Sequence, residues 1–79
     1  MKLAEMLRIK TDGVYDTDVN NYHVVALIKH LTPTVLNITL EYYRLDCDIA
    51  ECVKTLTPQT VMTAQYFSDI RNADWDYIC

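Results

Sequence analysis

Apolar residues recur at helical spacing in two segments of the N-terminal half. Within residues 2–10, Leu3, Met6 and Leu7 occupy positions i, i+3 and i+4, which predicts a short amphipathic helix. Within residues 24–31 the apolar positions recur at i, i+3, i+4 and i+7, a pattern typical of a helix with one apolar face. Two helices are therefore expected in this part of the chain.

Residues 34–45 fit two patterns at once. Ile38 and Leu40 alternate with polar residues, and this period of two is typical of a strand. The same segment also places apolar residues on two adjacent faces of a helix, which is typical of a deeply buried helix. The preceding Thr32-Pro33 offers an N-cap followed by proline at the first helical position. Because the neighbouring segments favour helices, we expect a helix here as well.

Residues 48–71 predict a short helix, a turn and a longer helix. Asp48 and Glu51 have the spacing of a capping box. Thr57-Pro58 repeats the N-cap and proline pair of a helix start. The fold expected from the whole pattern is all-α, a small bundle of four to five short helices with a helix-turn-helix-like segment near residues 48–71.

Length and cysteine content limit the organisation of the chain. Its 79 residues allow one domain, for which we expect residues 1–72, followed by a short C-terminal tail at residues 73–79. Three cysteines without a secretory signal predict free thiols in the cytoplasm. No apolar run approaches the roughly 18 residues of a membrane span. A chain this short buries little surface, so we expect a partner, either a larger protein or a second copy in a homodimer.

The charge balance disfavours a polyanionic partner. The chain carries 7 basic and 11 acidic residues, a net charge of −4. Affinity for nucleic acid comes largely from lysine and arginine that neutralise phosphates, and anionic membranes attract the same residues. Neither nucleic acid nor a membrane is therefore the expected partner.

One segment nevertheless resembles a DNA-binding motif. Ile49-Ala50 followed by Thr57-Pro58-Gln59-Thr60-Val61 resembles the I-A … S-P-x-T-V pattern of LuxR-type and sigma-factor helix-turn-helix segments. The resemblance implies a second helix in the major groove. It assigns base contacts to Gln59, Thr60 and Thr63, and phosphate contacts to Lys54 and Arg71. Across residues 44–71, however, three positive and four negative side chains give a net charge of −1, and the turn has no glycine.

No metal, cofactor or catalytic set is expected. Asp16-Thr17-Asp18 matches the opening of a calcium loop, but Asn21 and Leu27 occupy its glycine and bidentate-carboxylate positions. His23 and His30 are seven residues apart, whereas a helical zinc pair is four apart. No nucleophile, base and orienting group can be assembled from the sequence, and one glycine makes no phosphate loop.

Aromatic residues concentrate in the C-terminal half and indicate a binding surface. We expect the partner to contact Tyr66, Asp74, Trp75, Asp76 and Tyr77. The leading hypothesis is a non-catalytic, small acidic protein-binding module that acts as an inhibitor, antiactivator or adaptor of a larger protein. Its size and charge resemble those of regulators from phages or plasmids. The alternative is a helix-turn-helix transcription regulator that binds DNA.

Overall fold

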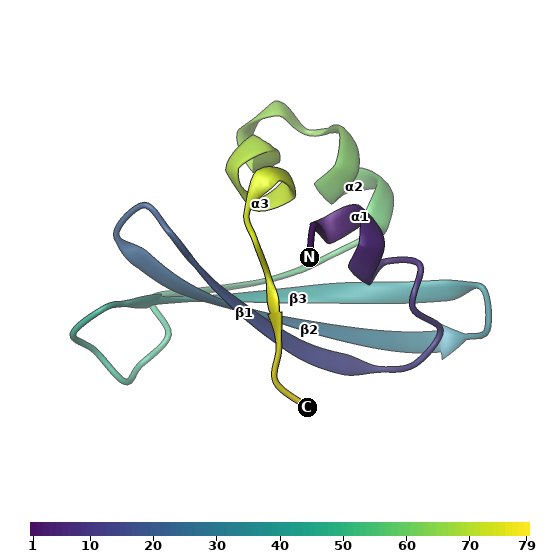
Figure 1. The fold of residues 1–79 in the computed structure, drawn as a ribbon, viewed down its shortest axis with the longest axis horizontal. Coiled ribbons are helices and arrows are strands. Elements are labelled where there is room, and N and C mark those ends of the chain that lie inside the picture. Colours follow the sequence, from purple (N-terminus) through teal and green to yellow (C-terminus); the bar gives the residue numbers. More distant parts are fainter.

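The computed structural model describes residues 1–79 and shows an antiparallel sheet with short helices packed on one face (Figure 1). The strands are β1 (Gly13–Val19), β2 (Tyr22–Thr32), β3 (Val35–Arg44), β4 (Cys52–Leu56) and β5 (Asp76–Tyr77). The helical segments are α1 (Leu3–Met6), α2 (Pro58–Thr63), the 3-10 turn η1 (Gln65–Phe67) and α3 (Ser68–Asn72). The order across the sheet is β4-β3-β2-β1-β5.

The prediction of an all-α helical bundle is wrong. Residues 24–31 lie in β2, residues 34–45 contain β3, and residues 52–56 form β4, so residues 48–71 contain no helix-turn-helix. The period of two in β3 was the correct signal, since Ile38 and Leu40 are fully buried. Long strands rich in β-branched residues suit a half-buried pleated surface, and here β2 and β3 pair along nearly their whole length.

The two Thr-Pro pairs have different roles. Thr57-Pro58 starts α2 as predicted, and the Thr57 hydroxyl accepts a hydrogen bond of 3.3 Å from the Thr60 amide. Thr32-Pro33 instead forms the turn between β2 and β3, where the Thr32 hydroxyl accepts from the Val35 amide at 3.1 Å. A capping hydroxyl serves a helix start or a tight turn equally well, so the chain that follows decides between them.

The core lies between one face of the sheet and the helices. Of the N-terminal helix predicted for residues 2–10, only Leu3–Met6 is helical, and Leu3 and Met6 are fully buried. The expected tail contributes to the core as well, because Trp75 is only 1% exposed and β5 pairs with β1. The twelve core residues are Leu3, Met6, Tyr15, Val24, Ala26, Ile28, Ile38, Leu40, Val61, Phe67, Ile70 and Trp75.

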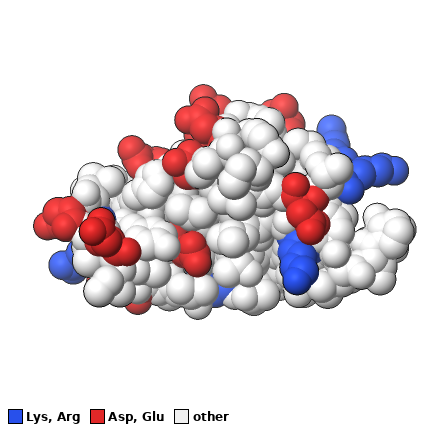
Figure 2. Space-filling model, turned by 90° about the horizontal axis from the view of Figure 1, so that it is seen from below, with Lys and Arg blue, Asp and Glu red and all other residues white.

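The helices cover only one face of the sheet. Figure 2 views the molecule from the side opposite the helices, and acidic side chains spread over much of this side. The largest group of lysine and arginine lies at its right-hand end.

None of the helices has the length and apolar character that a membrane-spanning helix requires.

Candidate functional site

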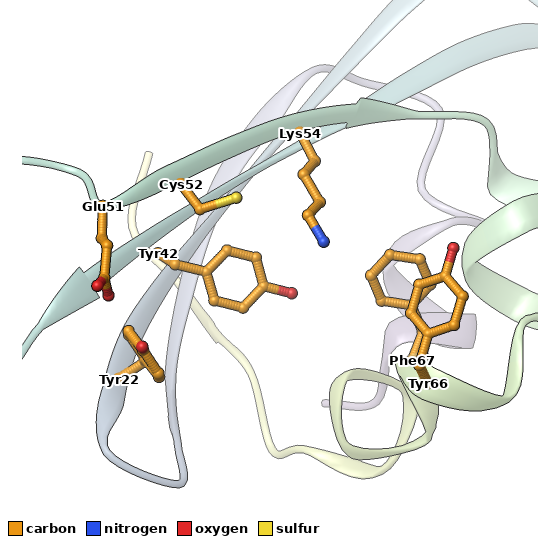
Figure 3. A pocket seen from close by; sticks show the side chains of 7 residues that line it. All are labelled: Tyr22, Tyr42, Glu51, Cys52, Lys54, Tyr66 and Phe67. Carbon is orange, nitrogen blue, oxygen red and sulfur yellow. The ribbon is translucent and has the colours of Figure 1, made fainter.

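A pocket of about 280 Å³ opens beside β4, between the sheet and η1 (Figure 3). Two strands and η1 supply most of its wall. Tyr42 and Cys52 are cross-strand partners, and Lys54 lies on the same face as Cys52 because side chains two apart in a strand share a face. The lining residues are Tyr22, Tyr42, Glu51, Cys52, Lys54, Tyr66 and Phe67.

Two aromatic pairs form opposite walls of the pocket. The rings of Tyr22 and Tyr42 meet edge to face, with centroids 6.0 Å apart. The rings of Tyr66 and Phe67 lie 4.6 Å apart on the η1 side. Burial raises the pKa of Tyr42, and the nearby Cys52 thiol raises it further. The walls therefore offer flat apolar surface to an incoming group.

Lys54 places a positive charge between these walls. Its ammonium lies 5.9 Å from the centroid of the Phe67 ring, within range of a cation–π interaction. Lys54 forms no salt bridge, whereas the nearby Glu51 carboxylate lies 3.6 Å from Arg44. The pocket thus combines apolar walls with an ammonium group that lacks an anionic partner. It suits a ligand group that is apolar or aromatic and has a carboxylate beside it.

The five residues assigned to DNA contact lie on β4, α2 and α3 and not on the two helices of a helix-turn-helix. Arg71 donates hydrogen bonds of 3.0 and 2.6 Å to two backbone carbonyls, so its guanidinium is used within the fold. The Thr63 hydroxyl donates to the Gln59 carbonyl at 2.7 Å, and the Thr60 hydroxyl lies 2.9 Å from the hydroxyl of the N-cap. Only Lys54 of this set lines the pocket.

The structure separates the residues predicted to bind a partner. Tyr66 is 74% exposed and lines the aromatic pocket. Trp75 is buried, and its indole nitrogen donates to the Ile70 carbonyl, so it offers no surface to a partner. Asp74 and Asp76 line a different hollow, and exposed Tyr77 packs edge to face against Tyr15 with centroids 5.3 Å apart.

The second hollow is acidic and has a volume of about 420 Å³. His23 lies among its carboxylates, with Nε2 3.3 Å from Asp16 and Nδ1 2.9 Å from Asp18. The hydroxyl of Thr17 donates to the Asp74 carbonyl at 2.8 Å. Nowhere in the chain do three or more histidine, cysteine, aspartate or glutamate side chains form a group that could hold a metal ion. Asp74 forms its ion pair outside the hollow, with the N-terminal ammonium at 3.0 Å, and the hollow has no apolar wall.

Sequence reasoning missed most of the aromatic pocket. Tyr22, Tyr42 and Phe67 come from three separate segments, which meet only because β2, β3 and η1 pack together. The one available signal was the alternation in residues 38–42, which places Tyr42 on the same face of the strand as buried Leu40. Comparison of the chain with protein-family models, with curated proteins and with solved structures finds no match.

Proposed function

We propose that this protein is a non-catalytic binding domain that captures a larger protein at the aromatic pocket beside β4. One observation carries the proposal: exposed Tyr66 and the Lys54 ammonium, which has no anionic partner, line the same apolar pocket. Aromatic anchors in partly enclosed pockets dominate the binding energy of protein interfaces. A tyrosine supplies a large contact area at a low cost in conformational entropy.

Exposed apolar side chains at the same end of the sheet support the proposal. Ile49 is 77% exposed and Leu45 is 65% exposed, and both lie in the loop between β3 and β4. Contiguous exposed apolar surface is typical of protein interaction sites. A partner that covers them would supply the burial that a chain of this length lacks.

The charge distribution favours a protein over nucleic acid as the partner. The net charge is −4, and Arg71 is held by internal hydrogen bonds. A phosphate backbone requires several free cations along one surface. By covering a surface of a larger protein, the domain would act as an inhibitor, antiactivator or adaptor.

The test is affinity capture from the native host, read by mass spectrometry, with three forms of the immobilised protein. Wild type and Leu31→Ser are expected to capture the same partner, and Tyr66→Ser is expected to retain at most about a tenth of it. Leu31 is a matched control because it is 56% exposed near the C-terminal end of β2 and does not line the pocket. Equal capture by all three forms, or recovery of nucleic acid alone, would contradict the proposal.

A further inference from the structure

One edge of the sheet ends in a strand with no neighbour. β4 is the terminal strand on its side of the sheet, and Val53, Lys54 and Thr55 are all exposed. A free strand edge presents backbone amides and carbonyls that can pair with another chain. The opposite edge is shorter, because β5 spans only Asp76–Tyr77.

The sheet's hydrogen bonds show which β4 residues face this free edge. The backbone groups of successive residues point alternately to opposite sides of a strand. The backbone groups of Val14 bond to Cys79 and Ile78 on the β5 side of β1. The backbone groups of its neighbour Tyr15 therefore point toward β2, where Tyr15 pairs with Ala26.

The same alternation carries across to β4. Since the backbone groups of Ala26 point toward β1, those of Val25 point toward β3, where Val25 pairs with Glu41. The backbone groups of Leu40, the neighbour of Glu41, then point toward β4, where Leu40 pairs with Lys54. The backbone groups of Lys54 therefore point toward β3. The backbone groups of Val53 and Thr55 therefore point outward, where no protein group meets them.

The aromatic pocket lies directly inside this free edge. Cys52 and Lys54 point from β4 into the pocket (Figure 3). A strand added beside β4 would place every second side chain on the same face, with directly opposed Cβ atoms about 5 Å apart. One of its side chains would lie opposite Lys54 and the next, two residues along, opposite Cys52 at the mouth of the pocket.

We propose that β4 accepts an extended segment of the partner protein as a sixth strand. The segment carries an acidic side chain opposite Lys54 and an aromatic or aliphatic side chain two residues away, which enters the pocket. Backbone hydrogen bonds to Val53 and Thr55 supply affinity, and the pocket supplies specificity, as in other cases of strand addition. The inference rests on the proposed protein-binding function and adds the chemistry of the bound segment.

Charge selects this occupant over a second copy of the chain. β4 (CVKTL) has no acidic side chain that a second copy could place opposite Lys54. An antiparallel β4–β4 pair centred on Lys54 would also set two ammonium groups directly opposite each other, where like charges are destabilising. An aspartate or glutamate at the same place gives Lys54 the partner that it lacks. An extended acidic and apolar segment therefore fits the edge better than β4 itself.

The probe is a library of random 12-residue peptides displayed on phage and selected on the immobilised full chain. Enriched peptides are expected to share an acidic residue two positions from an aromatic or aliphatic one. Synthetic versions are expected to bind Val53→Pro at least about tenfold more weakly than Val53→Ala, because the proline ring blocks the outer edge. Lys54→Ala should weaken binding about three- to tenfold, and Lys54→Arg should largely restore it.

Three results would overturn strand addition to β4 by an acidic segment. These are selection of peptides without the acidic and apolar pair, equal binding to Val53→Pro and Val53→Ala, and self-association of the wild type in sedimentation that Val53→Pro abolishes. The proposed function has a separate outcome. If Val53→Pro still captures the host protein that Tyr66→Ser loses, strand addition fails and the binding function stands; if neither variant loses it, both fail.

Discussion

The indole nitrogen of Trp75 donates a hydrogen bond of 3.0 Å to the backbone carbonyl of Ile70 inside the core. Trp75 belongs to the C-terminal segment, and Ile70 lies in α3. The bond therefore fixes the direction in which the chain leaves α3 and crosses to pair with β1. The segment expected as a short C-terminal tail therefore holds the helices and the sheet together.

Trp75→Phe is expected to lower the free energy of unfolding by about 1–3 kcal/mol, because it removes that donor and leaves a buried carbonyl unpaired. Trp75→Ala would also open a cavity and is expected to cost about 3–5 kcal/mol. Urea unfolding followed by circular dichroism measures both. A loss below about 0.5 kcal/mol for Trp75→Phe would show that the indole hydrogen bond contributes little to anchoring the segment.

Gly13→Ala is expected to destabilise the protein by about 1–2 kcal/mol. An added Cβ would lie 3.0 Å from a ring carbon of Tyr15 and 3.2 Å from one of Tyr77, and Tyr15 is buried and cannot move aside. Combining Gly13→Ala with Tyr77→Ala should recover part of the loss in a double-mutant cycle. If the site had room, the lower entropy of the unfolded chain would instead make Gly13→Ala stabilising.

The stability of the β1–β2 region should depend on pH through Asp12. The His30 amide donates to the Asp12 carboxylate at 2.6 Å, and His30 Nδ1 lies 3.1 Å from the same oxygen. These hydrogen bonds, the backbone one above all, lower the pKa of Asp12 in the folded state. The stabilisation is therefore complete above the unfolded pKa of about 3.9 and is lost as the pH falls through the lower folded value.

Asp12→Asn is thus expected to lower the melting temperature near neutral pH, with the difference from wild type shrinking as the pH falls below about 4. Thermal unfolding by circular dichroism across this range measures the effect. Asp46→Asn is the control, because Asp46 is exposed and forms no salt bridge. A difference for Asp12→Asn that stays constant with pH would show that the carboxylate charge is not responsible.

Thr57→Ala should cost about 1 kcal/mol, because Thr57 caps the first turn of α2. Thr34→Ala is a matched control in the β2–β3 turn, where Thr34 is exposed and uses only its amide. Equal free energies of unfolding for the two variants would mean that the cap contributes nothing to stability.

Proline substitutions test the orientation of β4 without any partner. Lys54→Pro should remove a ladder hydrogen bond to β3 and cost about 3 kcal/mol or more. Val53→Pro should cost far less, because its amide faces the free edge, where proline is tolerated. Chemical denaturation compares the two, and the reverse order of stability would show that Val53 rather than Lys54 pairs with β3.

Part of this fold was readable from local sequence. The amphipathic spacing of Leu3 and Met6 predicts α1, and Thr57-Pro58 predicts the start of α2. Both depend on groups within four residues of one another, so no distant contact is needed to form them. Of the pocket, Lys54 and Tyr66 could be named in advance, although Lys54 was assigned to a phosphate.

What the sequence by itself determined is therefore the local helix signals, the acidic charge and the presence of an apolar core. Only the tertiary structure decided that residues 34–45 form a strand. Their apolar pattern satisfies both periods, and the pairing of Ile38 and Leu40 with Ile28 and Ala26 of β2 selects the period of two. The same non-local pairing places Tyr42 beside Tyr22 and Cys52, so the candidate site exists only once the strands have met.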